Sequence, residues 1–516
     1  MKAFLARFSE MILGVINGFD RFVIRGFLRP IQAVPGMKHF LWNKRVRLTE
    51  FGDYALATTE KVKAASLRAA EETERPTPFV SAPGTDKAEL AQAIARKQGV
   101  TEGLIAVVRS VEVCPCYKIS RNHKEKKLDL VLRSRPCLHY YHYLLDPVFG
   151  FMNARLQTWF PFNIQICLNG REWLARAMDR EGLRYEKREN CFVWIDDIPR
   201  AQALMDEFLR TAWPEAFDRI RQRLNPVHED ILGSYDARYY WTGHQTEWAS
   251  DLLFRRPQDL AELHPALVRH ALLTFQSPHI MRFLGQKLRG NFQGEVTTHY
   301  DRRPEGVCVR HAVKTNSIKF YDKQGSVLRV ETTVNHPGDF KVYRPKEGDP
   351  DGPRSWREMR KGIADLHRRA EVCQAANDRY IDALAATDTS SRVGPLVEPL
   401  TRPTRWHRQR VRGLRPWSEE DRTLLEAILR GEFVLKGFRN HDLQALLFPQ
   451  NAPPPKEQRR RRSKVTRYIR MLRAHGIVHK VPSENRYLLS PKGREILVAL
   501  SATQNLTMQE IKKAAA

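Results

Sequence analysis

Residues 306–335 combine strand-like periodicity with side chains that could act on a phosphodiester. β-Branched and aromatic residues alternate there with polar ones, as in strands that bury one face. Gly325, within Lys-Gln-Gly-Ser, tolerates the positive φ of a tight turn, so we expect two antiparallel strands joined at residues 324–326. The register that this loop favours groups the following residues on the polar face: Lys319, Tyr321, Lys323, Arg329 and Glu331.

These residue types suit an attack on a phosphodiester. A tyrosine hydroxyl becomes an effective nucleophile when a cation or a base lowers its pKa. A carboxylate can hold a divalent metal ion that polarises the phosphate, and Lys or Arg can neutralise the charge that develops. The hairpin is therefore a candidate catalytic element. A solvated sheet face with a cross-strand Lys–Glu pair is the alternative.

The same hairpin carries a family resemblance. Phe-Tyr-Asp-Lys followed by Leu-Arg-Val-Glu resembles the Tyr-Asp-Lys … Leu-Arg-x-Glu segment of rolling-circle replication initiators of plasmids and filamentous phages. The resemblance is confined to this short segment. It implies that Tyr321 is a DNA-linking nucleophile and Glu331 a metal ligand. Lys319, Lys323 and Arg329 would support the reaction, with magnesium or manganese as the cofactor.

Two further carboxylates could complete a metal site. Glu247 and Asp251 are four residues apart, so they share a side whether the segment is a strand or a helix. We expect them to join Glu331 around a hard divalent cation. A surface acidic pair is the alternative.

Three cysteines and two histidines could instead hold zinc. A tetrahedral site would combine Cys114, Cys116 and Cys137 with either His139 or His142. Cys-x-Cys matches no standard zinc finger, and we favour strand residues packed beside an aromatic cluster. The two histidines also lack the His-hydrophobic-His spacing of replication relaxases.

The C-terminal region has the clearest pattern of elements. Ser418 with Asp421 resembles a capping box, Asn440 is expected to cap a second helix, and a third, basic helix carries an apolar stripe. Two short strands and a last helix follow. This order resembles bacterial winged helix-turn-helix domains, which implies that the helix at 463–475 enters the major groove of duplex DNA. The expected DNA-binding residues are Arg459, Arg460, Arg461, Arg462, Lys464, Arg467, Arg470, Arg473 and Arg486.

The composition also favours a nucleic-acid partner. The 516 residues carry a formal charge of +27, which a polyanion would neutralise; an anionic membrane surface is the alternative. No run of about twenty apolar residues is present, which excludes a transmembrane helix. Seven scattered cysteines and the lack of a signal-peptide pattern fit a cytoplasmic, nucleoid-associated protein.

The alternation of strand-like and helix-like segments predicts a mixed α/β (α+β), multi-domain protein in which helices cover a mixed sheet. Near the N-terminus we expect two strands that meet at Asn17-Gly18, with Asp20 starting the second. The expected divisions are an N-terminal basic α/β domain at 1–148, a central α/β domain at 149–388, a basic Pro-rich linker at 389–414, a winged helix-turn-helix at 415–502 and a tail at 503–516.

These observations leave more than one function open. The first is a mobile-element enzyme, a replication initiator or transposase-like protein, that nicks and joins DNA through a 5′-phosphotyrosyl link at Tyr321. The second is a non-catalytic protein that binds duplex DNA, single strands or structured RNA. A third is a metal-dependent nuclease or transposase that would use Asp20, Asp196 or Asp197, and Glu331.

Overall fold

The computed structural model divides the chain into two compact units. The first unit comprises Met1–Leu13, Phe254–Val330 and Ala375–Ala516, and the second comprises Gly14–Leu253 and Glu331–Gln374. The structure describes residues 1–500 except for 83, 123–125, 234, 236, 276, 286–295, 304–305, 350, 387–392, 430–432, 434–436, 450–453, 483, 491, 494–495 and 498–499.

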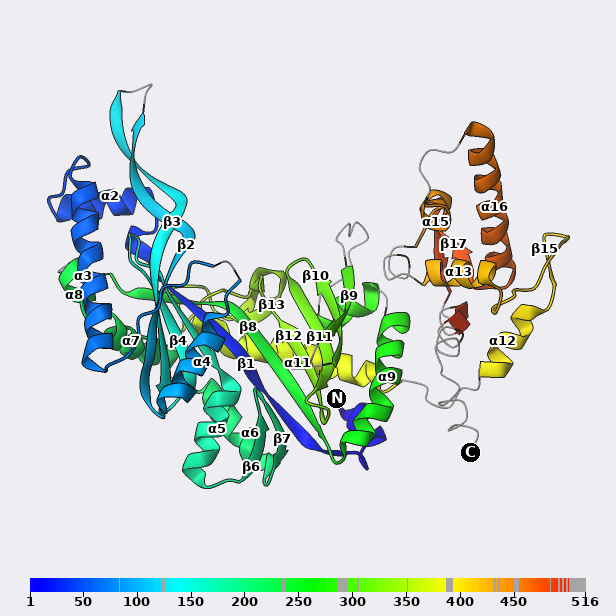
Figure 1. Ribbon diagram of the computed structural model, residues 1–516, viewed down its shortest axis with the longest axis horizontal. Coiled ribbons are helices and arrows are strands. Elements are labelled where there is room, and N and C mark those ends of the chain that lie inside the picture. Colours follow the sequence, from blue (N-terminus) through cyan, green and yellow to red (C-terminus); the bar gives the residue numbers. More distant parts are fainter. Residues whose placement is uncertain are drawn as a thin grey trace. The chain divides into compact units, whose positions relative to one another are not determined.

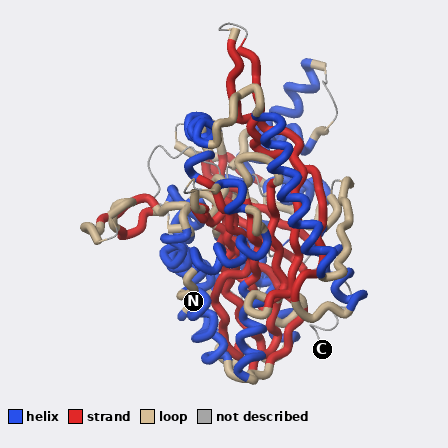
Figure 2. The backbone as a smooth tube through the Cα atoms, turned by 90° about the vertical axis from the view of Figure 1, so that its left-hand side faces the viewer, coloured by secondary structure: helices blue, strands red, loops and turns tan. Residues whose placement is uncertain are grey.

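The second unit is built on an antiparallel sheet (Figure 1) with the strand order β2-β3-β4-β5-β1-β8-β12. Strands β2 and β3 have 20 residues each, and in Figure 2 their far end projects as a long two-stranded ribbon. The strands are β1 (Ile12–Leu28), β2 (Gly103–Asn122), β3 (Lys127–Asp146), β4 (Gly150–Gln157), β5 (Ile164–Asn169), β8 (Tyr239–Phe254) and β12 (Val327–Thr333). The expected mixed α/β class is confirmed, but the sheet is antiparallel rather than the expected mixed sheet.

Helices pack on this sheet through aromatic side chains. Phe22 of β1 contacts Phe208, Trp213 and Phe217, which come from α6 (Ile198–Leu209) and α7 (Trp213–Leu224). The other elements of this unit are α2 (Val34–Asn43), α3 (Phe51–Glu72), α4 (Lys87–Gln98), α5 (Gly170–Glu181), β6 (Tyr185–Arg188), β7 (Cys191–Ile195), α8 (His228–Leu232), β13 (Lys341–Arg344), β14 (Ser355–Glu358) and the start of α11 (Leu366–Leu384).

The expected break at Asn17-Gly18 is wrong. Strand β1 runs without interruption from Ile12 to Leu28, so Asp20 lies inside a long strand. Gly18 is required by packing rather than by a turn, since a Cβ at this position would lie 2.0 Å from Met205 Cε on α6.

The loop of the hairpin expected within residues 306–335 lies in the first unit, whereas residues 331–335 belong to the second. Strand β11 (Asn316–Lys323) ends and β12 begins at the residues that flank the expected 324–326 loop, and Gly325 has a φ of 74°. The loop prediction is therefore confirmed. The remaining elements of this part are α1 (Lys2–Arg7), α9 (Pro257–Thr274), α10 (Ser277–Phe283), β9 (Val296–Arg303) and β10 (Gly306–Val313).

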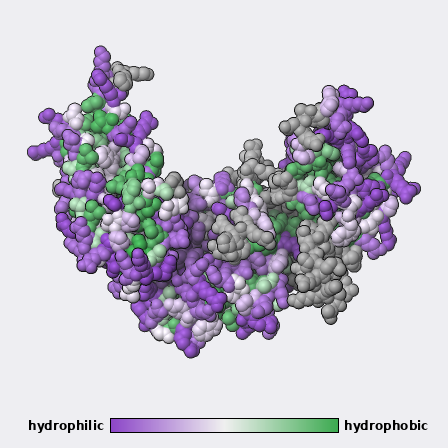
Figure 3. Space-filling model, viewed as in Figure 1, coloured by the Kyte–Doolittle hydropathy of each residue, from purple (hydrophilic) through white to green (hydrophobic). Residues whose placement is uncertain are grey.

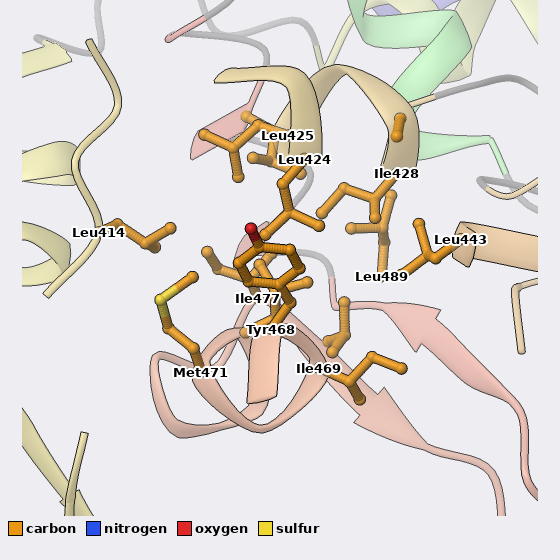
Figure 4. Close-up of a cluster of buried hydrophobic side chains, with 14 of the residues drawn as sticks. Leu414, Leu424, Leu425, Ile428, Leu443, Tyr468, Ile469, Met471, Ile477 and Leu489 are labelled. Atoms are coloured by element: carbon orange, nitrogen blue, oxygen red, sulfur yellow. The ribbon is translucent and has the colours of Figure 1, made fainter. Parts of the chain in front are cut away.

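The C-terminal part of the first unit places helices around its own apolar core. Figure 4 shows Leu424, Ile428, Tyr468 and Leu489 among the side chains that converge there. Strands β17 and β18 pair antiparallel, with Val478 opposite Leu489. The elements are α12 (Val393–Thr401), β15 (Thr404–Trp406), β16 (Gln409–Val411), α13 (Glu419–Ile428), α15 (Asn440–Leu447), α16 (Pro455–Ala474), β17 (Val478–Lys480) and β18 (Tyr487–Leu489).

The two helix starts expected in this part have different outcomes. Ser418 caps α13 by accepting the backbone N–H of Asp421 at 3.4 Å, as expected. Asn440 is instead the first residue of α15. Its side-chain amide donates to Thr466 Oγ1 on α16 at 3.0 Å, so Asn440 joins two helices rather than capping one.

Hydrophilic side chains cover much of the face seen in Figure 3. None of the helices in the described part of the chain is long and apolar enough to cross a membrane.

Candidate functional site

Three carboxylates from adjacent strands meet in the second unit. Asp20 lies on β1, Glu247 on β8 and Glu331 on β12. One oxygen atom from each lies within 4.8 Å of the other two. Only 3% of Asp20 and 1% of Glu331 is exposed, while Glu247 is half-buried. The group is therefore built into the sheet rather than scattered over its surface.

Two asparagine amides hold Asp20 in position. Asn169 Nδ2 donates to Asp20 Oδ1 at 3.0 Å, and Asn190 Nδ2 donates to Oδ2 at 3.1 Å. Asn169 is itself fixed, because its Oδ1 caps α5 by accepting two backbone N–H groups. Gly170 allows this close approach, since a Cβ there would lie 1.8 Å from the Phe19 carbonyl oxygen.

Asp251, which the sequence predicted beside Glu247, has a different role. Its carboxylate pairs with Arg171 on α5, whose Nε and Nη2 lie 3.0 and 2.9 Å from Oδ2. The structure thus groups Glu247 and Glu331 with Asp20 rather than with Asp251. Asp196 pairs with the exposed Arg184, and Asp197 caps α6.

Positive charge surrounds the same strands. Burial, and then the charges of nearby basic side chains, lowers the pKa of His244 to about 4. His244 lies on β8, three residues before Glu247. The basic side chains are those of Arg25, Arg155, Lys361 and Arg21. An anionic ligand would be favoured there.

The predicted catalytic hairpin is more buried than a solvated sheet face would be. Arg329 is 0% exposed and Lys323 is 8% exposed, which contradicts the solvated-face alternative for these two residues. Tyr321 is half-buried, and Lys319 Nζ lies 5.4 Å from the centre of its ring. Tyr321 belongs to the first unit and Glu331 to the second, so a joint role in catalysis stays a prediction.

The three cysteines of the candidate zinc site come together. The Sγ atoms of Cys114, Cys116 and Cys137 lie within 4.8 Å of one another. Hydrogen bonds from the other two thiols lower the pKa of Cys137 to about 3. Neither candidate histidine belongs to this group. His139 bonds through Nδ1 to the Cys137 carbonyl oxygen, and burial lowers the pKa of His142 to about 4.

The basic side chains of α16 and the hairpin after it divide into two sets. One set is engaged by neighbouring groups: Arg461 with Glu457, Lys464 with Glu420, Arg470 with Gln409, Arg473 with the Trp406 ring, and Arg486 with Glu484. The other set has exposed side chains: Arg459, Arg462 and Arg467, with the exposed Arg460 lying 3.8 Å from Glu457. Among the described residues, no hydrogen bond or ion pair engages the side chains of Arg459, Arg462 or Arg467.

Sequence reasoning did not identify the residues that support the site. Asn169 and Asn190 were not singled out, because 149 and 170 residues separate them from Asp20. An asparagine before a glycine and a helical segment signals a helix cap, but it does not reveal a carboxylate partner.

Comparisons with protein-family models, with curated proteins and with solved structures found no match to this chain.

Proposed function

We propose that this chain is a metal-dependent enzyme that cleaves or joins nucleic-acid strands, with Asp20, Glu247 and Glu331 as its metal ligands. The observation that carries the proposal is the convergence of these three carboxylates on adjacent strands. Carboxylate groups this close repel one another when ionised, and a hard divalent cation such as Mg²⁺ or Mn²⁺ relieves the repulsion by binding carboxylate oxygens.

The chemistry follows from the ligand type. A divalent cation supplies a Lewis acid that polarises a phosphodiester and can lower the pKa of the attacking group. Asp20 would be a fixed ligand, because Asn169 and Asn190 set its orientation. Half-buried Glu247 lies toward the accessible side of the group. The basic residues near His244 would hold the substrate phosphates.

The C-terminal part supplies a second nucleic-acid contact. We propose that α13, α15, α16 and the β17–β18 hairpin form a winged helix-turn-helix that delivers the enzyme to duplex DNA. Val465, Tyr468 and Leu472 bury one side of α16, while Arg459 and Arg467 lie on the exposed side. An exposed arginine face on such a helix suits phosphate and base contacts in a major groove.

The test combines metal binding with cleavage. Wild-type protein and the near-isosteric variants Asp20→Asn, Glu247→Gln and Glu331→Gln would be melted with EDTA, Mg²⁺ or Mn²⁺. The same samples would be incubated with labelled single-stranded DNA, supercoiled DNA and RNA. At a hundredfold excess over Kd, metal binding should stabilise the folded wild type by about 2.7 kcal/mol. We therefore expect metal to raise its melting temperature. Each variant should lose both this increase and the cleavage.

Asp206→Asn is the matched control, because Asp206 is an exposed carboxylate on α6 that accepts one hydrogen bond from Gln202. It should behave as the wild type. An equal metal effect in all three site variants would refute the metal site. Metal and DNA binding without cleavage of any substrate would refute the enzyme and favour the non-catalytic binding protein.

A further inference from the structure

We propose that Cys114, Cys116 and Cys137 form a binding site for a thiophilic metal ion, Zn²⁺ in the cell, with three thiolate ligands and one position left for an external ligand. The site lies on the β2–β3 hairpin and is independent of the three-carboxylate group. A test of this cysteine site is therefore independent of any test of the proposed enzymatic function.

The sheet register places the three thiols on one face. Cys114 lies opposite Arg135 on β3, and Cys137 lies opposite Glu112 on β2. Alternate residues of a strand share a face, so Cys114 and Cys116 point the same way as Cys137. The β2–β3 pairing therefore fixes this arrangement without any loop.

The sulfur positions fit a metal ion. The Sγ atoms of Cys114 and Cys116 are 3.5 Å apart, and all three Sγ atoms lie within 4.8 Å of one another. Zinc–sulfur bonds of about 2.3 Å in tetrahedral geometry separate two sulfurs by about 3.8 Å. Small side-chain rotations would bring all three to this separation.

The same register disfavours a disulfide. Residues two apart in one strand have Cα atoms separated by about 6.6 Å, near the upper limit for a bridge, which argues against Cys114–Cys116. Cys137 is a diagonal neighbour of Cys114, and such pairs lie about 7–8 Å apart. Cys116 is farther still along the strand from Cys137. A metal ion can join sulfurs that a direct S–S bond cannot.

The surroundings are polar and partly open. Gln157 Nε2 lies 3.6 Å from Cys116 Sγ, and Thr158 Oγ1 lies 4.0 Å from Cys137 Sγ. Groups that donate to ligating atoms orient them and tune the metal. Cys116 and Cys137 are buried whereas Cys114 is half-buried, so an ion could enter beside Cys114. The open fourth position would face the same side.

The first measurement uses the unmodified full chain under reducing conditions. Zinc content after dialysis against micromolar Zn²⁺ would be measured by mass spectrometry of the metal. Cd²⁺ titration would be followed through the thiolate-to-metal charge-transfer absorption. Protection of the three thiols from a maleimide would be mapped by peptide mass spectrometry. We expect one ion per chain, three thiolate contacts and zinc protection of Cys114, Cys116 and Cys137 only.

Variants then test the ligand set. Cys114→Ser, Cys116→Ser and Cys137→Ser should each weaken Zn²⁺ binding about tenfold or more. Cys167→Ser changes a half-buried cysteine on β5 and is the matched control that should bind normally. His139→Gln should also bind normally, and loss of binding in that variant would overturn the three-thiolate assignment.

Two outcomes with the unmodified chain would overturn the site whether or not the variants fold. The first is maleimide labelling of the three cysteines that zinc does not change. The second is a disulfide among them in protein purified without reductant. Nuclease activity is not a readout in either measurement.

Discussion

Arg171 and Asp251 form an ion pair in which both side chains are almost fully buried, with 0% and 2% exposed. Arg171 Nη2 lies 2.9 Å from Asp251 Oδ2, and Nε lies 3.0 Å from the same oxygen. The pair joins α5 to β8. Asn169, which caps α5, also donates a hydrogen bond to Asp20. By fixing α5 on the sheet, the ion pair therefore helps to position Asp20 in the three-carboxylate group.

Asp251→Ala should strongly destabilise the protein. It leaves the Arg171 guanidinium buried without its partner, which typically costs about 3–5 kcal/mol of unfolding free energy. Urea unfolding monitored by circular dichroism would measure the change. Asp196→Ala is the control, because the pair of Asp196 with Arg184 is exposed and such pairs contribute about 0–1 kcal/mol. Equal losses in the two variants would contradict a supporting role for the buried pair.

The free energy of unfolding should decrease at acidic pH, because His311 binds a proton more readily in the unfolded chain than in the folded one. Its ring is buried between Thr298 Oγ1 at 2.8 Å and the Tyr380 hydroxyl at 3.0 Å, and burial lowers its pKa to about 3. The unfolded chain takes up this proton near pH 6.5. Between about pH 6.5 and pH 3 the unfolded state binds more protons, so lowering the pH favours unfolding by up to about 1.4 kcal/mol per pH unit.

His311→Gln removes this titration. The stability difference between wild type and variant should shrink by about 2 kcal/mol between pH 7 and pH 5. His299→Gln, at an exposed position of β9, is the control. Chemical denaturation at the two pH values makes the comparison. A difference between wild type and His311→Gln that does not change with pH would show that His311 is protonated in the folded state as well.

Local signals were sufficient for some elements but not for the site. The 324–326 loop follows from turn chemistry within a few residues, and it is confirmed. Gly18 carries the same kind of signal, but it lies inside the continuous strand β1, where a Cβ would lie 2.0 Å from Cε of Met205, a residue far away in the sequence. A glycine can thus mark a turn or a close approach, and only the packing partner decides which.

The carboxylate group shows the same limit. Because Glu247 and Asp251 are four residues apart, the sequence predicts that they share one side, and it does not distinguish their roles. In the structure, Arg171 on α5 pairs with Asp251, while Glu247 lies with Asp20 and Glu331. The position of Arg171 depends on how a helix packs against the sheet. Periodicity could therefore nominate these carboxylates, but it could not assign them to the metal site or to the ion pair.

The exposed arginines of α16 should set the salt dependence of duplex binding. The triple variant Arg459→Gln, Arg462→Gln, Arg467→Gln keeps helix propensity and removes three charges that no described residue neutralises. The slope of log K against log salt is negative, and each lost phosphate contact should reduce its magnitude by about 0.9. Fluorescence anisotropy on one duplex at several salt concentrations would measure the slope.

A control triple removes the same charge elsewhere: Arg68→Gln, Arg96→Gln and Lys97→Gln, at exposed positions of α3 and α4. It should leave the slope almost unchanged. Equal effects of the two triples would mean that net charge, rather than α16, governs binding.

Tyr321→Phe distinguishes the two ways in which the proposed enzyme could break a strand. If the tyrosine hydroxyl attacks, the wild type should leave labelled DNA attached to the protein in denaturant, and the variant should lose both attachment and nicking. Metal binding should persist in the variant, because Tyr321 is not one of the three carboxylates. Nicking that survives in Tyr321→Phe, with no attached label in the wild type, would identify water as the nucleophile. The role of Tyr321 as a DNA-linking nucleophile, which the resemblance to rolling-circle initiators implies, would then be wrong.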